Sequence, residues 1–528
     1  MKLTHRIGLV YIPGALPCFE AFGNLPTDMV KEDGLIEGRP ASEALDMMII
    51  PGGSLVESQT LSGKLAKEIT KMADSGKFVL GICSGFQILS KKTDIGRLSA
   101  TPIMRQGLGL IDAEFLPLIC TDLVKATIVA PSNLTDAVGV EVKGFHCHTY
   151  GNVVVGKGTK PILLSHAKRL NYHSDPRDLV AGVANTEGNV VGIIVHALLD
   201  QNPIIIDGII GSLGIKSQEL AEIKAVNAKL TGRIRTEVGV STGIHAVAKS
   251  PKTGTAKALL ITALGSGSGK TFIVTGLASA LKKKGLAVDV VKIGGDIRDL
   301  VPALYMIKEP IKGYSSIKIG ESGWKQPFDA IRKASREYGF IIIEGAMSAF
   351  TGLFMNHAEG PTSTAEVAAA LGVPTVVVGE CDNEGIEGAL ASSLNYVSLL
   401  RKLGVNVAGV ILNKVRVSYL TSEIRQFIQS VYSNAGVELL GIVPRVNLEG
   451  RGAIPEIEIK YEEFGAKALE VAETSLELDR IVRAATPAYV KELDYAALVE
   501  KFKVLLTEDF GVDVSKDANH KGCLKMKD

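Results

Sequence analysis

The sequence lacks the cysteine spacing of a disulfide-bonded or zinc-ribbon protein. Its six cysteines lie far apart, and no Cys-x-x-Cys pair occurs among them. Small disulfide scaffolds and zinc ribbons both need cysteines at short, regular spacings, so the sequence disfavours both classes. We therefore expect a protein of the reducing cytoplasm.

The chain also lacks an excess of either charge and a long apolar run. Its 58 basic and 57 acidic residues leave a net charge of +1, so no global field would attract nucleic acid or an anionic membrane. Residues 1–6 carry no apolar signal core, and no uncharged apolar run approaches a membrane span. We expect small-molecule partners, no nucleic acid and no membrane, and we leave a homodimer open.

The length and the pattern of apolar runs predict two α/β domains. A chain of 528 residues with 46% apolar residues is long enough for more than one core. Residues 6–12 and 44–50 read as strands, residues 62–75 as a helix, and residues 78–82 as the next strand. This alternation is typical of an open, mainly parallel sheet covered by helices.

The segment 78–89 predicts a nucleophile. Its apolar run stops at Cys83 and resumes with helical spacing, which places the cysteine on a sharp turn from strand to helix. Gly81 and Gly85 allow a tight turn, and the N–H groups of the following helix favour a thiolate. The alternative is a buried structural cysteine.

Histidines supply a candidate base. His196 follows the apolar strand 190–195 and emerges at the end of that strand, with Asp200 four residues further on. The segment His146-Cys147-His148 suggests a metal cluster as one alternative. Because alternation puts both histidines on one face and Cys147 on the other, we favour a positioning role for His148 instead.

These motifs resemble class I glutamine amidotransferase domains, especially those of cobyrinic and cobyric acid amide synthases. The resemblance is carried by Pro-Gly-Gly at 51–53, Gly-Ile-Cys-Ser-Gly-Phe-Gln at 81–87 and the segment 188–200. It implies that Cys83 attacks the side-chain amide of glutamine and that His196 protonates the departing ammonia, leaving a glutamyl thioester. Many relatives carry a Glu two residues after the histidine, where this chain has Leu198, so Asp200 or a backbone carbonyl is expected to orient the ring. The implied oxyanion and glutamine-binding residues are Gly52, Gly53, Ser84, Gln87 and His148.

A second set of motifs predicts a phosphate-binding loop. A strand at 258–263 is followed by Leu-Gly-Ser-Gly-Ser-Gly-Lys-Thr at 264–271 and a helix. Glycines let backbone N–H groups close on phosphates, a lysine neutralises them, and the threonine can bind Mg²⁺. Leu264 stands where the strict pattern has glycine, and the loop resembles the variant of dethiobiotin synthetase-like proteins. The predicted ATP-binding residues are Gly265, Ser266, Gly267, Ser268, Gly269, Lys270, Thr271, Asn413 and Lys414.

Acidic residues at strand ends predict the metal site. The segment 292–299 resembles the Lys-x-Gly-Pro-Asp-x-x-Asp segment of the cobyrinic acid synthases, and Glu344 follows four apolar residues. Burying a carboxylate at the end of such a strand costs free energy unless a cation pairs with it. The alternative is a Glu that caps a helix or is exposed to solvent. We expect Thr271, Asp296 and Glu344 to bind Mg²⁺, and Asp299 to face the substrate.

Together the two halves predict an ATP-dependent, glutamine-hydrolysing amidoligase that acts on carboxylates, first of all those of a cobyrinic acid-like tetrapyrrole. The alternatives are a dethiobiotin synthetase-like ligase and a regulatory P-loop ATPase with a fused domain. The related synthases usually carry the two domains in the opposite order. The basic residues expected to meet a polycarboxylate, or else to form a solvated face, are Lys292, Arg298, Lys308, Lys312 and Lys318. The predicted domains are 1–212 (amidotransferase), 213–256 (helix and linker), 257–480 (ATP-binding) and 481–528 (helical extension and tail).

Overall fold

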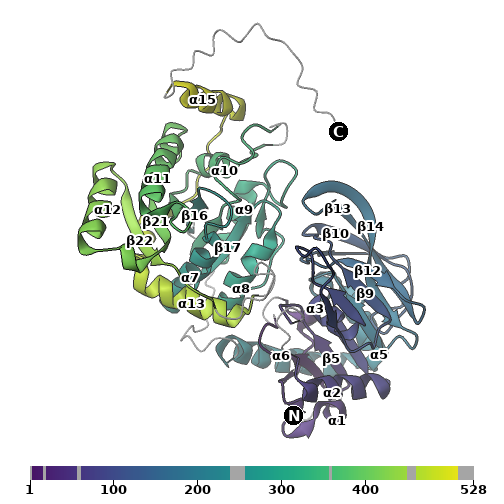
Figure 1. The fold of residues 1–528 in the computed structure, drawn as a ribbon. Helices are drawn as coiled ribbons and strands as arrows, with labels where there is room; N and C mark the ends of the chain where they lie inside the picture. Colours follow the sequence, from purple (N-terminus) through teal and green to yellow (C-terminus); the bar gives the residue numbers. More distant parts are fainter. Residues whose placement is uncertain are drawn as a thin grey trace.

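The computed structural model describes residues 3–15, 20–55, 61–237, 256–355, 360–448 and 459–508. Two α/β domains lie side by side, and each is built around its own sheet (Figure 1). The predicted fold class is confirmed. Most of the predicted linker, residues 238–255, and the tail from 509 lie outside the described residues. Among the helices that are described, none is both long enough and apolar enough to cross a bilayer.

The first domain has a mixed sheet. Its strands β15, β6, β5, β1 and β2 run parallel, whereas β11, β10, β13 and β14 extend the sheet in antiparallel fashion. The central parallel strands β6 and β15 carry no polar side chain and are buried along their whole length, as strands covered on both faces are. Across the sheet the strands are β11 (Glu141–Phe145), β10 (Leu123–Ile128), β13 (Thr159–Leu170), β14 (His173–Asn185), β15 (Val190–Ile193), β6 (Phe78–Ile82), β5 (Met47–Ile50), β1 (Ile7–Val10) and β2 (Asp28–Val30).

Smaller elements complete the first domain. Helix α2 starts at Ser62, whose hydroxyl accepts from the Leu65 N–H at 3.2 Å, and it buries Leu65, Ile69 and Met72. The other strands are β12 (Asn152–Val155), β9 (Ala113–Leu116), β7 (Lys92–Asp94), β8 (Met104–Gln106), β3 (Leu35–Ile36) and β4 (Arg39–Pro40). The helices are η1 (Phe22–Asn24), α1 (Ala41–Ala44), α2 (Gly63–Asp74), α3 (Ser84–Leu89), α4 (Leu198–Gln201), α5 (Pro203–Leu213) and α6 (Ser217–Glu237).

The second domain is a parallel sheet with the glycine loop at its centre. The loop follows β16, which lies between β19 and β20. In order, the strands are β18 (Ser316–Ile317), β17 (Val288–Ile293), β19 (Phe340–Glu344), β16 (Lys257–Ala263), β20 (Thr375–Glu380), β21 (Val407–Val415) and β22 (Glu438–Pro444). The helices are α7 (Lys270–Lys283), η2 (Ile297–Leu300), α8 (Val301–Ile307), α9 (Pro327–Ala334), α10 (Thr364–Leu371), α11 (Gly385–Lys402), η3 (Val417–Tyr419), α12 (Ser422–Asn434), α13 (Tyr461–Ser475), α14 (Leu478–Ala484) and α15 (Tyr495–Glu508).

The C-terminal extension packs onto the second domain. Helix α14 spans the position where we expected the domain to end, and β23 (Thr486–Pro487) then pairs antiparallel with β16. Further on, α15 buries Leu498, Val499 and Phe502 in the same core cluster as the central strands. Figure 1 shows this helix beside α10, at the far end of the domain from α13.

Several contacts between described residues join the two domains. Phe145 at the end of β11 packs against Trp324 with ring centroids 5.5 Å apart, and the Trp324 indole N–H donates to the Thr121 carbonyl at 3.0 Å. The hairpin formed by β13 and β14 reaches the second domain at Tyr172 (Figure 1), whose hydroxyl donates to Asp296 at 3.1 Å. Tyr11, just after β1, lies with its hydroxyl 3.3 Å from that of Tyr305.

Candidate active site

The predicted nucleophile sits on a strained turn. Cys83 caps the short helix α3 with φ 52° and ψ −109°, a conformation that residues other than glycine rarely adopt. A Cβ at Gly85 would lie 2.0 Å from the Ile50 carbonyl oxygen, so only glycine allows α3 to pass this close to β5. Cys83 is 8% exposed, and its Sγ lies 3.8 Å from the carbonyl oxygen of Cys147.

His196 lies against Cys83, as predicted, but its carboxylate partner is Glu20. The His196 Nδ1 is 2.6 Å from one Glu20 oxygen, and the other accepts from the Ala197 N–H at 2.8 Å. Burial alone would lower the pKa of His196. Hydrogen bonds with Cys83 and Glu20 outweigh that effect and raise the pKa to about 10. His196 therefore lies between the Cys83 thiol and the Glu20 carboxylate and interacts with both.

The expectation that Asp200 orients the ring is wrong. Its carboxylate accepts from the N–H groups of Ala21 and Gly23, each at 2.8 Å, and so anchors the loop that carries Glu20. Helix α4 begins two residues after His196 and turns Asp200 away from the imidazole. Glu20 precedes Cys83 by 63 positions and stands in no recognisable motif, so sequence spacing offered no signal for it.

The other predicted glutamine-site residues divide into two groups. Gly52 faces the reacting pair, because a Cβ there would lie 2.9 Å from the His196 ring, and the Ser84 hydroxyl donates to the Gly53 carbonyl. Gln87 and His148 point into the interior instead. The Gln87 Nε2 is 3.4 Å from the Tyr150 carbonyl, and the His148 Nδ1 is 3.2 Å from the Leu118 carbonyl. Burial lowers the pKa of His148 well below its usual value.

The predicted glycine loop has the conformation that phosphate binding needs. Gly267 and Gly269 take left-handed φ values of 77° and 83°, and α7 begins directly after them at Lys270. The Lys270 ammonium donates to the carbonyls of Gly265, at 3.2 Å, and Met347, at 2.7 Å. Burial, aided by the nearby Lys292, lowers the pKa of Lys270 to about 8.

The two residues predicted from the strand after α11 lie near the same loop. The Asn413 side-chain amide donates to the Ser268 carbonyl at 2.8 Å, and this hydrogen bond joins the end of β21 to the glycine loop. Lys414 lies 3.5 Å from Glu380 and has a left-handed φ of 58°. Ser266 is exposed at the tip of the loop.

A buried charge cluster lies at the start of α7. The Thr271 hydroxyl donates to Glu344 at 2.9 Å, and Lys292 bridges Glu344 at 3.1 Å and Asp299 at 2.7 Å. The second carboxylate oxygen of Glu344 is buried without a hydrogen-bond partner, and burial raises the pKa of this acid. An orphaned oxygen beside a threonine hydroxyl and a glycine loop is an arrangement that Mg²⁺ fits.

The structure separates Asp296 from this cluster, so our expectation that it joins Thr271 and Glu344 needs correction. Both Asp296 oxygens pair with Arg298, at 2.8 and 2.7 Å, which turns the acid toward the first domain. Burial would raise the pKa of Asp296, but the ion pair with Arg298 lowers it. Asp299, expected to face substrate, is the acid that shares Lys292 with Glu344.

The predicted basic segment is partly taken up by internal ion pairs. Lys292 is buried between two acids, and Arg298 is paired with Asp296. Lys312 lies over the Tyr338 ring and 3.5 Å from the buried Asp289, and so stabilises the domain interior. These contacts leave less free positive charge for a polycarboxylate than the sequence suggested.

Arg298 links the two predicted sites directly. Its Nη1 donates to the Thr149 hydroxyl at 2.9 Å, and its Nη2 donates to the Tyr172 hydroxyl. Thr149 ends the segment 145–149, whose Phe145 stacks on His196 with ring centroids 5.3 Å apart. The segment 145–149 therefore contacts His196 through Phe145 and the acidic segment of the second domain through Thr149.

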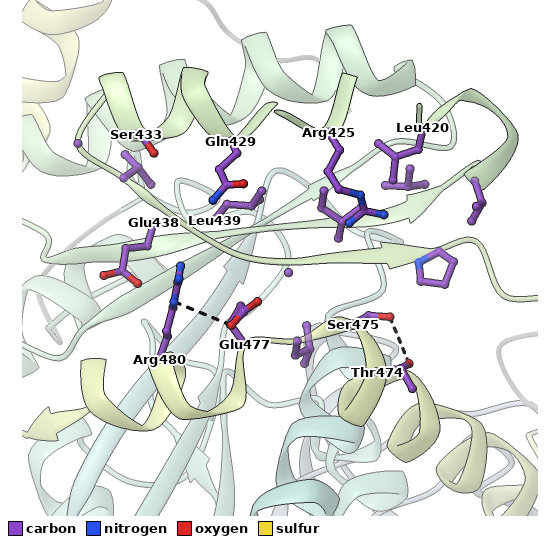
Figure 2. A pocket seen from close by; sticks show the side chains of 18 residues that line it. Leu420, Arg425, Gln429, Ser433, Glu438, Leu439, Thr474, Ser475, Glu477 and Arg480 are labelled. Atoms are coloured by element: carbon purple, nitrogen blue, oxygen red, sulfur yellow. Dashed lines mark hydrogen bonds and ion pairs between the residues drawn. The ribbon is translucent and has the colours of Figure 1, made fainter. Parts of the chain in front are cut away.

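A separate cavity of about 780 Å³ lies between α12, β22 and α14. Figure 2 shows Arg425 and Gln429 on one side and Glu477 on the other, where Glu477 pairs with Arg480 at 3.9 Å. None of the described residues that line it belongs to the predicted glutamine or ATP sites.

The fold and the site define a chain that combines a glutamine amidotransferase-type domain with a P-loop nucleotide-binding domain. Residues 10–204 match the family model of the CobB/CobQ-like glutamine amidotransferase domain. Residues 259–451 match that of the CobQ/CobB/MinD/ParA nucleotide binding domain. The resemblance to the cobyrinic and cobyric acid synthase family is confirmed at both domains.

Curated relatives carry synthase names. The chain is 30% identical over 189 residues to a cobyric acid synthase of Thermoanaerobacter sp. (strain X514), covering 34% of this chain and 36% of that one. It is 29% identical over 255 residues to the hydrogenobyrinate a,c-diamide synthase of Mycobacterium tuberculosis (strain ATCC 25618 / H37Rv), covering 46% and 49%. The chain thus spans a third to a half of the length of these relatives. Among solved structures, the Aquifex aeolicus MinD cell division protein is 16% identical with a TM-score of 0.29, over 43% of this chain and 96% of that one.

Proposed function

We propose that this protein is a glutamine-dependent amide synthase, which hydrolyses glutamine in the first domain and uses ATP in the second to convert a carboxylate into a carboxamide. The observation that carries the proposal is the buried set of Cys83, His196 and Glu20, directly behind a segment that contacts the nucleotide-binding domain. A regulatory ATPase has no need of such a set.

In the first domain Cys83 attacks the side-chain amide carbon of glutamine. The charged His196 donates its proton to the departing nitrogen, so ammonia leaves and a glutamyl thioester remains on Cys83. Water then releases glutamate. Glu20 holds the Nδ1 side of the ring, which leaves Nε2 as the proton donor and acceptor. Backbone N–H groups near Gly53 and Ser84 would stabilise the oxyanion.

In the second domain the glycine loop and Lys270 would hold the phosphates, and Thr271 with Glu344 would hold Mg²⁺, which neutralises phosphate charge when bound. Phosphate transfer to the substrate carboxylate gives an acyl phosphate. Ammonia from the first domain attacks its carbon, phosphate leaves and the amide forms. The Lys270 ammonium donates hydrogen bonds to the carbonyls of Gly265 and Met347. A bound phosphate would replace those contacts.

The names of the relatives favour a tetrapyrrole polycarboxylate as substrate. The curated relatives are named cobyric acid synthase and hydrogenobyrinate a,c-diamide synthase, and we extend to this chain the substrate class that these names indicate. The internal ion pairs of Lys292, Arg298 and Lys312 reduce the support that a free basic segment would have given.

The decisive experiment compares two nitrogen sources. Cys83→Ser should lose glutaminase activity and glutamine-dependent synthesis, while ammonium chloride still supports synthesis, because the second domain is untouched. Cys381→Ser, which changes a buried cysteine of the second domain, is the matched control and should retain glutaminase activity. Glutaminase activity in Cys83→Ser would refute the assignment of the nucleophile.

Substrate identity is tested separately by mass spectrometry. Protein, ATP and glutamine are incubated with cobyrinic acid, its partly amidated forms, and nickel-containing or metal-free precursors. Each carboxylate converted to an amide lowers the mass by a small, fixed amount. No change with any of them, alongside active glutaminase, would remove the tetrapyrrole and leave the amide synthase.

A further inference from the structure

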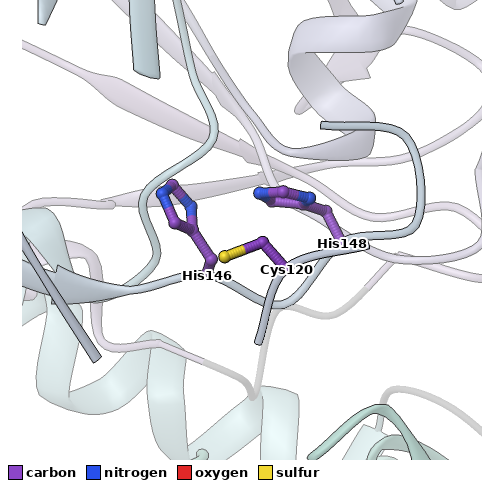
Figure 3. A group of neighbouring side chains, drawn as sticks. All are labelled: Cys120, His146 and His148. Atoms are coloured by element: carbon purple, nitrogen blue, oxygen red, sulfur yellow. The ribbon is translucent and has the colours of Figure 1, made fainter. Parts of the chain in front are cut away.

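Cys120, His146 and His148 form a buried cluster in the first domain (Figure 3). One potential ligand atom from each residue lies within 4.8 Å of the other two. None of the three side chains is more than 3% exposed. We propose that this cluster is a binding site for a borderline-soft divalent cation such as Zn²⁺.

The backbone fixes the three side chains relative to one another. Cys120 and His148 are partners in an antiparallel bridge, with two N–H to carbonyl hydrogen bonds of 3.1 Å each. His146 lies two residues before His148 on the same face, and the two rings are 4.7 Å apart at their centroids. The sulfur comes from a different segment than Cys147, which the sequence had suggested for a metal cluster.

Both histidines are oriented as metal ligands are. The His148 Nδ1 is 3.2 Å from the Leu118 carbonyl, and the His146 Nδ1 is 3.2 Å from the Ile194 carbonyl. A carbonyl only accepts, so each Nδ1 carries the proton and each Nε2 keeps its lone pair. Ligating histidines commonly donate their other N–H to a backbone carbonyl in this way.

One ring nitrogen points at the cluster and has no partner. The His148 Nε2 is buried and makes no hydrogen bond, and Figure 3 shows it directed toward the side of the ring where Cys120 and His146 lie. Leaving such a group unpaired costs about 1–3 kcal/mol. A cation at this point would satisfy it. The His146 Nε2 is 2.8 Å from the Ser165 hydroxyl, a contact that the cation would replace.

The ligand chemistry selects the ion. One sulfur and two imidazoles suit Zn²⁺, whereas Mg²⁺ prefers oxygen, so this site differs from the one at Thr271 and Glu344. Three protein ligands leave a fourth position for water or the Ser165 oxygen. Binding converts the Cys120 thiol to a metal thiolate and releases its proton to solvent.

A bound ion would hold in place the segment 145–149, which lies against Cys83 and His196. It would tie Cys120 to the segment 145–149, in which the Cys147 carbonyl faces Cys83 and Phe145 stacks on His196. The role inferred here is structural, because all three ligands are buried.

The test uses the full chain carrying Cys83→Ser, because Cys83 and His196 form a second thiol–imidazole pair that would bind the same ion. Protein purified without chelator should hold about one zinc per chain by elemental analysis. After chelation, Co²⁺ should produce a thiolate-to-cobalt charge-transfer absorption. Adding Cys120→Ser should abolish both signals, while the matched change of another buried cysteine, Cys381→Ser, should leave them intact.

Two results would overturn the proposal. The first is zinc content and cobalt absorption at background in the Cys83→Ser protein, a result that does not depend on how the second variant folds. The second is retention of both signals when Cys120 is replaced. His148→Gln provides an independent check, because it should also lose the absorption if His148 is a ligand. A circular dichroism spectrum of each variant accompanies the measurement.

Discussion

Glu20 offers the sharpest test of the amidotransferase site, because sequence patterns did not indicate it. In Glu20→Gln the side chain keeps its size and one hydrogen-bond acceptor but loses its charge. A His196 pKa of about 10, against an ordinary value of 6.5, corresponds to roughly 5 kcal/mol in favour of the charged ring. Cys83 and Glu20 both contribute to this preference for the charged ring. Loss of the Glu20 charge should remove about 2 kcal/mol of it, which lowers the His196 pKa by about 1.5 units.

The direction of the pH dependence follows from the raised pKa. The folded protein holds the His196 proton more tightly than the unfolded chain, so this contribution to stability is complete below about pH 6.5 and lost as the pH rises through about 10. Histidine nitrogen NMR should show the His196 ring of the native protein charged at pH 8. The same ring in Glu20→Gln should be neutral at a distinctly lower pH.

Activity gives the second readout. The glutaminase kcat of Glu20→Gln should decline at a pH about 1.5 units lower than that of the native protein, and the deficit should approach ~30-fold only above about pH 10, because the variant loses at lower pH the proton that ammonia must receive. Glu43→Gln, on the exposed face of α1, is the control and should change nothing. A glutaminase pH profile that matches the native one, in a folded variant whose His196 titrates as before, would show that Glu20 does not support this ring.

Three further outcomes follow from the geometry. Lys270→Ala should weaken ATP binding ~10-fold or more by calorimetry, since a charged hydrogen bond contributes about 1.5–3 kcal/mol, and unchanged affinity would contradict the phosphate role. Arg298→Ala should lower synthesis from glutamine more than synthesis from ammonium, measured side by side; equal losses would argue against a link through Thr149. Gly85→Ala should lower the melting temperature, because overpacking costs about 1–3 kcal/mol, whereas Gly63→Ala, with open space around it, should not.

The sequence was most informative where local chemistry decides the structure. The Cys83 turn, the glycine loop and the strands before each of them follow from glycine positions and uninterrupted apolar runs, and the structure has them at those residues. These features depend on neighbours along the chain. Short-range patterns therefore predicted both domains and the places where their ligands should lie.

Long-range pairing was beyond such patterns. Glu20 reaches His196 from a loop 176 positions away, and Arg298 captures Asp296 because Tyr172 of the other domain closes the same network. Strand β10 alternates exposed and buried residues along its whole length, but the first six residues of β14 are all exposed and carry no alternating pattern. No spacing rule along one chain indicates which of two nearby acids a distant side chain will hold.

At the tip of the β13–β14 hairpin, Tyr172 has a strained backbone and also makes a contact with the second domain. Asn171 and Tyr172 both have left-handed φ values, 49° and 71°, which cost a tyrosine about 1–3 kcal/mol that a glycine would not bear. The same tyrosine supplies the hydroxyl that joins Asp296 and Arg298 across the domain boundary. Glycine at this position would relieve the backbone strain but would remove the hydroxyl contacts with Asp296 and Arg298. A screen for thermostability alone would therefore favour glycine at position 172, at the cost of a contact between the two domains.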